Sequence, residues 1–241
     1  MSLRVLVLTT ETPHHAFFVK ELISAGHSVT VVEEHATTLA VSMGSTFQQK
    51  QELYERSLWF ADTAPSLADL CRTRSVAGVN TSEGLEVLKR SDSDVAISFG
   101  TGWIKADALA LLPEERWNLH GGDPQKYRGL DSHLWALYHN DSEALVTVLH
   151  TLDPELDRGA VIAGSSIDLT GSPELHMLRA ASTELAVSLV LGSLAYLEAV
   201  GQVPRMPQAA VGRYYSALPT TLLATCARRY AAITHHDRIG Q

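Results

Sequence analysis

Short, nearly uninterrupted apolar runs recur along the first half of the chain. They cover residues 5–8, 29–32, 76–79 and 95–99, and each is followed by polar residues or glycine. Runs of this kind are typical of strands that are buried on both faces, as in a parallel sheet covered by helices. The segments between them are long enough for helices. The pattern therefore predicts alternating strands and helices.

The segments between the runs carry apolar residues at helical spacing. Pro13 suits the first turn of a helix, Phe18 and Leu22 lie on one face of it, and Gly26 ends it. The same pattern predicts helices over residues 47–61, 82–90, 106–112, 132–138, 175–200 and 220–233.

These elements predict an α/β fold, in which a mostly parallel, twisted sheet has helices on both faces. The sequence changes at Gly201 toward proline, glycine and tyrosine, so we expect a catalytic domain over residues 1–200 and a short C-terminal tail with a helix over residues 201–241. The first strand–helix unit lacks G-x-G-x-x-G, so no dinucleotide cofactor is predicted. Glu33 and Glu34 end the second strand, where they would bind a ribose or lie in solvent.

A strand over residues 117–120 carries two polar side chains on one face. Asn118 and His120 are two positions apart, and alternate residues of a strand point the same way. Gly121 and Gly122 follow, and glycine lets backbone approach a ligand closely because it has no Cβ. Polar groups at the end of a parallel strand often form a ligand site in α/β folds, although histidines also occur there without such a role.

A second polar turn follows an alternating strand over residues 145–152. The pattern N-x-H…YRG, followed by LD-x-G before an apolar strand, resembles the folate-dependent formyltransferases. These include glycinamide ribonucleotide, methionyl-tRNA and sugar N-formyltransferases. The resemblance extends to about residue 169. It implies that Asn118, His120 and Asp157 are catalytic and that N10-formyltetrahydrofolate is the co-substrate.

The residue types suit formyl transfer, which passes through a tetrahedral oxyanion. Asn118 would donate a hydrogen bond to the formyl oxygen, and His120 would relay a proton between the attacking amine and the leaving nitrogen. Asp157 would orient the imidazole. A neutral amine is already a nucleophile, so no activated serine or cysteine is needed.

In the family, the loop after the fourth strand places backbone groups against the pteridine ring of folate. In this chain the corresponding loop covers residues 100–104. The alternative to a folate-binding loop is a plain strand-to-helix turn with Trp103 in the core. The candidate folate contacts are Gly102, Trp103 and Ile104, faced by Leu152, Asp153 and Pro154.

The loop after His120 departs from the family pattern. Many members carry Ser-Leu-Leu-Pro, of which only Pro124 is present here. Arg158 also stands where small residues are usual, and it would reach a substrate phosphate or the folate tail. The contacts that the family makes through these positions are therefore not carried over to this chain.

The words HGGDP and YRGLDSHLWA, with Tyr214-Tyr215-Ser216 in the tail, look most like the sugar N-formyltransferases. A nucleotide-linked amino sugar is therefore the expected acceptor. The alternatives are another small amine, or water in a formyltetrahydrofolate hydrolase. The candidate acceptor contacts are His14, at a helix start where phosphate can bind, and Lys126, Tyr127, Arg128 and Asp131, for which exposed loop positions are the alternative.

Composition narrows the remaining partners. A net charge of −8 argues against a broad nucleic-acid surface, and the tail is shorter than the tRNA-binding barrel of methionyl-tRNA formyltransferases. Two cysteines cannot form a disulfide framework or a zinc site, and His139 and His150 lack metal-ligand spacing, so no metal is predicted and both histidines are assigned structural or surface roles. The early first strand and the lack of apolar runs near 18 residues predict neither a signal peptide nor a membrane span. We expect a cytoplasmic protein. The sequence is compatible with a homodimer but does not fix the oligomeric state.

Overall fold

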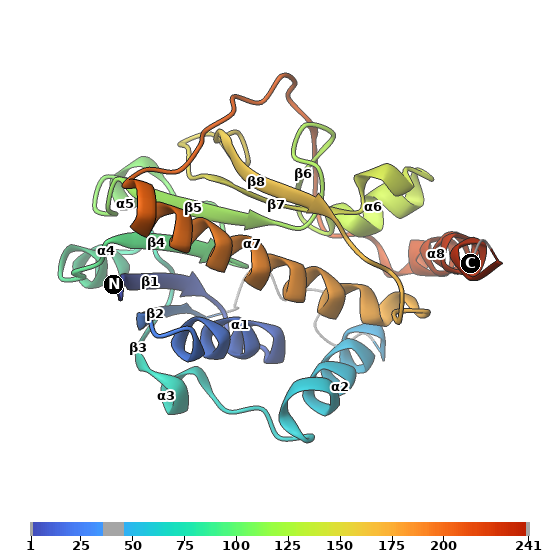
Figure 1. The fold of residues 1–241 in the computed structure, drawn as a ribbon, viewed down its shortest axis with the longest axis horizontal. Coiled ribbons are helices and arrows are strands. Elements are labelled where there is room, and N and C mark those ends of the chain that lie inside the picture. The colour runs from blue at the N-terminus through green and yellow to red at the C-terminus, as the bar shows by residue number, and fades with distance from the viewer. Residues whose placement is uncertain (1, 36–45, 240–241) are drawn as a thin grey trace.

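The structure is a computed structural model that describes residues 2–35 and 46–239. Its main sheet contains β1 (Arg4–Thr9), β2 (Ser28–Glu34), β3 (Arg72–Val76), β4 (Val95–Phe99), β5 (Glu115–His120), β7 (Val146–Thr151) and β8 (Val161–Ser166), in the order β3-β2-β1-β4-β5-β7-β8. The first five of these strands pair in parallel, whereas β7 pairs antiparallel with β5 and β8. The expected α/β fold with a mostly parallel sheet is confirmed (Figure 1).

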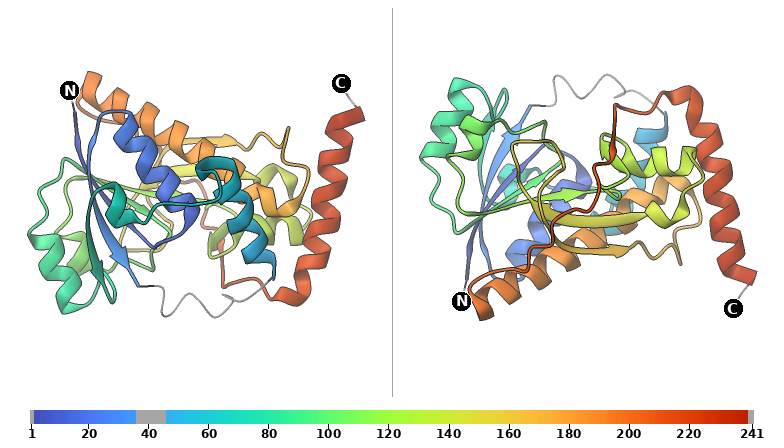
Figure 2. Two further views of the ribbon diagram at one scale, coloured as in Figure 1. Left: turned by 90° about the horizontal axis from the view of Figure 1, so that it is seen from below. Right: turned by 90° about the horizontal axis from the view of Figure 1, so that it is seen from above.

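Helices cover this sheet on both sides, as Figures 1 and 2 show. They are α1 (Pro13–Ser24), α2 (Thr46–Phe60), α3 (Leu67–Leu70), α4 (Ser82–Lys89), α5 (Ala106–Leu109), α6 (Ser132–Tyr138), α7 (Leu178–Val200) and α8 (Leu223–Ile239), with 3-10 turns η2 (Ser142–Ala144), η3 (Leu175–Met177) and η4 (Thr220–Leu222). A separate pair of strands, β6 (Tyr127–Gly129) and β9 (Arg213–Tyr215), runs in parallel.

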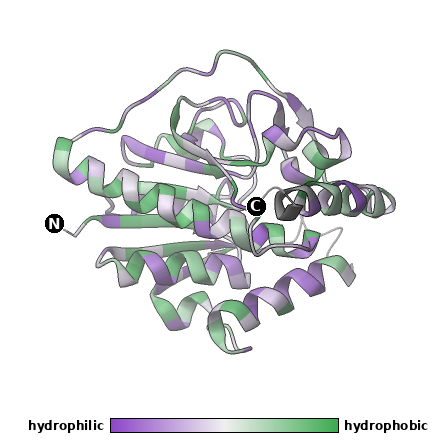
Figure 3. Ribbon diagram, turned by 45° about the vertical axis from the view of Figure 1, so that its right-hand side comes forward, coloured by the Kyte–Doolittle hydropathy of each residue, from purple (hydrophilic) through white to green (hydrophobic). Residues whose placement is uncertain are grey.

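The alternation of side chains along β1 explains the two layers of helices. Val5 and Val7 belong to the core shared with α1 and α7, whereas Leu6 and Leu8 belong to the core shared with α4 and α5. Burying both faces requires a continuously apolar strand, which is the pattern that the sequence shows. Figure 3 shows the matching division along the helices, where hydrophobic and hydrophilic residues alternate.

Helix α7 covers one face of the sheet, with one side buried in the core and the other side exposed. By length and composition, residues 175–200 could cross a membrane, and half of that stretch is buried inside the fold. The buried face of α7 packs with β1 and α1 in the main core. The sequence contains no uninterrupted apolar run of that length, and burial of one side of α7 in the core accounts for its apolar composition.

The edge of the sheet differs from the sequence prediction. The third strand is found at Arg72–Val76 and not at residues 76–79, because an edge strand that is mostly exposed needs no apolar run. Val79 is buried beyond the strand end. Helix α5 ends at Leu109, before the predicted end at residue 112, and α8 begins at Leu223, after the predicted start at residue 220. The sequence pattern did not predict α3, β6 or β9.

The segment after residue 200 returns across the domain. Met206 forms an isolated antiparallel bridge with Val161, and β9 pairs with β6. Helix α8 then packs on α6 through a core that includes Leu137, Cys226 and Tyr230. The returning segment therefore lies within reach of the loops at the carboxyl ends of the central strands (Figure 2).

Candidate active site

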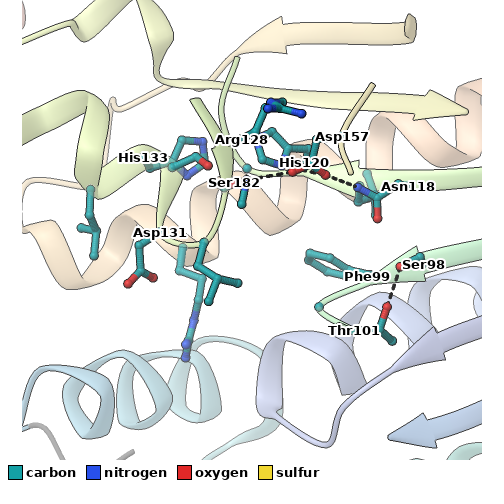
Figure 4. A pocket seen from close by; sticks show the side chains of 18 of the residues that line it. Ser98, Phe99, Thr101, Asn118, His120, Arg128, Asp131, His133, Asp157 and Ser182 are labelled. Atoms are coloured by element: carbon teal, nitrogen blue, oxygen red, sulfur yellow. Dashed lines mark hydrogen bonds and ion pairs between the residues drawn. The ribbon is translucent and has the colours of Figure 1, made fainter. Parts of the chain in front are cut away.

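A cavity of about 900 Å³ opens where β4 and β5 end. The loop after β4, the end of β5, the loop after β7 and the starts of α6 and α7 line it (Figure 4). This is the position where parallel α/β sheets commonly bind ligands. All three residues that the sequence assigned to catalysis are in its lining: Asn118, His120 and Asp157.

Asn118 and His120 both face one carboxylate oxygen of Asp157. Asn118 Nδ2 donates to Asp157 Oδ1 over 3.4 Å, and His120 Nδ1 lies 3.7 Å from the same oxygen. His120 is 5% exposed and Asp157 is 8% exposed. Two adjacent inward positions of β5 and one loop residue thus form a compact, buried polar cluster.

The imidazole of His120 is held in one orientation by a backbone carbonyl. Its Nε2–H donates to the carbonyl oxygen of Tyr127 over 2.8 Å. In the neutral ring, Nδ1 then carries no proton and faces Asp157. Nδ1 is therefore the atom of His120 that can accept a proton, and Asp157 is beside it to stabilise the resulting cation.

The backbone conformation of Asp157 and two hydrogen bonds hold this residue in place. Its φ of 54° is in the left-handed region, which an aspartate adopts more readily than most residues. Its Oδ2 accepts the backbone N–H of Gly129 over 2.8 Å, and Gln208 Nε2 donates to its carbonyl oxygen over 2.9 Å. Gln208 comes from the returning C-terminal segment, and sequence reasoning missed it because no local pattern joins it to Asp157.

Gly129 explains why the YRG motif ends in glycine. Its φ is 92°, and a Cβ there would lie 2.3 Å from the carbonyl oxygen of Tyr215. A side chain at this position would separate β6 from β9 and displace the amide that binds Asp157.

His150 belongs to the cluster, which corrects its expected structural or surface role. The antiparallel register places it directly opposite Asn118, and it is 1% exposed. Burial lowers the pKa of His150 to about 4, so the ring is neutral near pH 7. Its Nδ1–H donates to the Thr151 carbonyl over 2.9 Å, which leaves Nε2 to accept Asn118 Nδ2 over 3.1 Å.

The amide group of Asn118 is consequently oriented with its oxygen toward the cavity. Its two N–H groups face His150 Nε2 and Asp157 Oδ1, both of which are acceptors. Figure 4 shows the oxygen of Asn118 on the side away from Asp157. We expected Asn118 to donate a hydrogen bond to the formyl oxygen. In this orientation it instead offers the ligand a hydrogen-bond acceptor, its Oδ1.

Gly121 and Gly122 accommodate α6, and Gly121 also lines the cavity, so the close approach of a ligand to its backbone stays a prediction. A Cβ on Gly122, whose φ is 145°, would lie 2.7 Å from the Cβ of Ser132, and a Cβ on Gly121 would lie 3.0 Å from the His133 ring. The two glycines therefore let the first turn of α6 approach the end of β5.

The two loops expected to hold folate face the same cavity. Trp103 is 54% exposed, so the alternative that placed it in the core is wrong. Its Nε1–H donates to the Pro154 carbonyl over 3.0 Å, which joins the loop after β4 to the loop after β7. The expected folate residues that line the cavity are Gly102, Trp103, Ile104, Leu152 and Asp153.

Three residues expected to reach a phosphate already have partners within the protein, and of these His14 also lines the cavity. His14 shares a hydrogen bond of 2.9 Å with Thr12 Oγ1, and burial lowers its pKa well below its ordinary value, so it carries no charge near pH 7. Lys126 Nζ is exposed and binds Asp141 over 3.1 Å. Arg158 is likewise exposed and paired with Glu155.

Arg128 lines the cavity but is tied to main chain. Its Nε–H donates to the Gly212 carbonyl over 2.6 Å, and its Nη1 donates to the Leu156 carbonyl over 3.1 Å. It therefore links the returning C-terminal segment to the loop that carries Asp157. A structural role follows from these contacts, in place of the expected phosphate contact.

Tyr127 and Asp131 differ in their access to the cavity. Tyr127 is 6% exposed, and its hydroxyl donates to Asp141 over 3.2 Å. Asp131 lines the cavity, and its Oδ2 accepts the Leu218 N–H over 2.8 Å. Desolvation by the surrounding protein, which disfavours the charged form, raises the pKa of the Asp131 carboxyl above its ordinary value. In the described part of the chain, no group of three side chains is arranged to hold a metal ion.

The chain is similar in sequence to methionyl-tRNA formyltransferases. The chain is 28% identical over 121 residues to methionyl-tRNA formyltransferase from Thermosynechococcus vestitus, which is 50% of this chain and 36% of the relative. It is 29% identical over 144 residues to the Methylobacterium nodulans protein of the same name, 59% of this chain and 46% of the relative. The chain thus spans less than half the length of these curated relatives. No family model matches it.

Solved structures share the fold over most of the chain. An N-formyltransferase from Helicobacter canadensis, in complex with folinic acid and dTDP-3-aminofucose, gives a TM-score of 0.58 at 12% identity and covers 90% of this chain and 71% of that one. The formyltransferase PseJ from Anoxybacillus kamchatkensis gives 0.52 at 15% identity, covering 88% and 85%. HypX from Aquifex aeolicus with tetrahydrofolic acid gives 0.58 at 18% identity, covering 96% and 34%. The chain has the α/β fold of these formyltransferases and is similar in sequence, over about half its length, to methionyl-tRNA formyltransferases.

Proposed function

We propose that the chain transfers the formyl group of N10-formyltetrahydrofolate to a primary amine. The observation that carries this proposal is the convergence of Asn118, His120 and Asp157 in one cavity. The cavity also lies between the two loops that the family resemblance assigns to folate. Folate complexes of two proteins with this fold support the choice of co-substrate.

The reaction needs a proton acceptor and a proton donor at the same place. The amine nitrogen attacks the formyl carbon, and the carbonyl oxygen becomes an oxyanion. The bond between the formyl carbon and N10 then breaks, and N10 takes a proton. His120 Nδ1 can take the proton from the attacking amine and return it to N10, while Asp157 stabilises the imidazolium between the two steps.

Asn118 would orient the nucleophile. Its Oδ1 is oriented toward the cavity and can accept an N–H of the amine, which aims the nitrogen lone pair at the formyl carbon. His150 acts through Asn118 in this scheme, because it fixes which end of the amide faces the ligand.

The acceptor favoured by the structural neighbours is a nucleotide-linked amino sugar. Inside the cavity, however, the guanidinium of Arg179 is paired with the fully buried Glu55 over 2.6 and 2.9 Å, and Arg128 is bound to carbonyl groups. The exposed Lys50 lines an adjoining hollow that shares Phe47 and other lining residues with the cavity. We infer that the sugar amine enters the cavity while the diphosphate stays toward Lys50.

A panel of acceptors tests the proposal. The protein would be incubated with N10-formyltetrahydrofolate and, separately, dTDP- or UDP-linked amino sugars, free glucosamine, methionyl-tRNA and no acceptor. Release of tetrahydrofolate together with a formylated sugar nucleotide is the expected result. Preference for methionyl-tRNA, which the sequence relatives would support, or release without an acceptor would overturn the sugar assignment. Absence of release in every reaction would refute formyl transfer itself.

Replacing Arg128 by Ala is expected to lower stability more than substrate selectivity. Two hydrogen bonds from a charged donor disappear, and the loss of about 1–3 kcal/mol would lower Tm by about 2–12 °C in a protein of this size. KM should rise by similar factors for formylfolate and for the amine, because the loop of Asp157 loosens. Thermal unfolding and steady-state kinetics measure both effects.

Lys126→Ala is the matched control for Arg128, because it removes an exposed cation whose pairing with Asp141 contributes little to stability. An unchanged Tm for Arg128→Ala, with a higher KM for the nucleotide sugar alone, would restore the role of Arg128 as a phosphate-binding residue.

A further inference from the structure

Glu34, at the end of β2, connects the loops that follow two other strands. Its Oε1 accepts the backbone N–H of Val79 over 3.0 Å, and its Oε2 accepts the backbone N–H of Gly102 over 2.9 Å. Both oxygens are thereby engaged by main chain. The sequence suggested a ribose contact or a solvated strand end for this residue, and the structure shows neither.

Asn80 completes the connection on the same side of the loop after β4. Its Nδ2–H donates to the Trp103 carbonyl over 2.8 Å, and its Oδ1 accepts the Lys105 N–H over 2.8 Å. Together, Glu34 and Asn80 bind three backbone groups between residues 102 and 105. The indole of Trp103 extends the connection to the Pro154 carbonyl, in the loop that leads to Asp157.

The loop would have little rigidity of its own. Gly100 has a φ of 79°, and Gly102 lacks a side chain, so the segment between β4 and α5 has many accessible conformations when it is not held. Backbone groups that bind a ligand must be held in place before binding if the ligand is not to bear the cost of ordering them.

We propose that Glu34 and Asn80 are positioning residues that hold residues 102–105 in the conformation that binds the folate co-substrate. This inference rests on the proposed function, since it assigns the loop to folate. Neither residue is among the described residues that line the cavity, so they act on folate only through the loop. The acceptor amine does not contact residues 102–105 in this scheme, so its KM should not depend on them.

The chemistry of each contact defines a sharp pair of substitutions. Glu34→Gln keeps the shape of the side chain but turns one of its two acceptors into an N–H donor that faces a backbone N–H. Asn80→Asp keeps its shape but places an oxygen against the Trp103 carbonyl. Asn80→Asp therefore breaks one contact to the loop, and Glu34→Gln breaks one of the two hydrogen bonds through which Glu34 joins Gly102 to Val79, without creating a cavity. Glu33→Gln, on the neighbouring residue, is the matched control for loss of a carboxylate charge.

The experiment measures folate binding separately from acceptor use. Folinic acid is titrated into each protein by calorimetry, and KM for formylfolate, KM for the amine and Tm are determined. Both loop variants should raise Kd for folinic acid at least about tenfold, the equivalent of one lost hydrogen bond near 1.4 kcal/mol. KM for formylfolate should follow, while KM for the amine and the behaviour of Glu33→Gln stay close to wild type.

The possible outcomes separate this inference from the proposed function. If the wild-type protein binds no folinic acid and transfers no formyl group, the proposed function fails. If it binds folinic acid and both variants bind equally well, the positioning role is wrong. A lower Tm with equal effects on both substrates would show a merely structural role and would also overturn the inference.

Discussion

Replacing His120 by Ala is expected to lower kcat for formyl transfer by about 10³-fold, within the range usual for the loss of a general acid–base group. The atom lost is Nδ1, which faces Asp157 at 3.7 Å and has no substitute at the same position. KM for formylfolate should change little, because the two loops proposed to bind folate do not depend on this ring. Initial rates of tetrahydrofolate release at saturating substrate give the measurement.

The control for His120 must separate chemistry from folding. His120→Ala also leaves the Tyr127 carbonyl without its partner in a buried place, so a modest fall in Tm is expected. His139→Ala removes an exposed imidazole near the same segment and should keep wild-type kcat. A His120→Ala protein that is folded and retains kcat within about threefold would exclude this residue from the proton relay.

Local patterns were sufficient for the parts of the fold that depend on neighbours in sequence. The apolar run of β1 requires burial on both faces, and the structure places alternate residues in two different cores. The positions of Asn118 and His120 on one face follow from the period of a strand. The sequence failed at β3, where an exposed edge strand carries no apolar run.

The rest of the site depends on pairings between distant segments. His150 reaches Asn118 only because β7 pairs antiparallel with β5 in one particular register. Gln208 reaches the Asp157 backbone only because the chain returns across the domain after α7. A one-residue change of register would turn His150 to the other face, and nothing in the local sequence specifies that register.

Charged residues illustrate the same limit. The sequence showed that Arg128 and Lys126 follow the strand that carries Asn118 and His120, but it did not show their partners. In the structure, two main-chain carbonyls bind Arg128, and Asp141 binds Lys126. A cation in a loop is therefore a weak predictor of a phosphate site until the carbonyls and carboxylates around it are known.

Acid is expected to destabilise the fold steeply through its buried histidines. Burial lowers the pKa of His133 and of His150 from 6.5 to about 4, and it lowers the pKa of His14 and His15 well below the same value. A group whose pKa is lower in the folded state stabilises the fold fully above its unfolded pKa. That stability is lost as the pH falls from about 6.5 toward about 4, by about 1.4 kcal/mol per pH unit for each such histidine.

His133→Gln tests this contribution at a single site. The imidazole Nε2–H of His133 donates to the Val146 carbonyl over 2.6 Å, and the amide of glutamine can donate there without titrating. Urea unfolding should give a shallower loss of unfolding free energy for the variant once the pH falls below about 6.5. The difference should approach about 1.4 kcal/mol per pH unit between about pH 6 and about pH 5, whatever the stability of the variant at neutral pH. His139→Gln, at an exposed position, should follow the wild-type slope. If His133→Gln lost stability in parallel with the wild type, His133 would have to be protonated in the folded state, and the acid sensitivity would have to come from other groups.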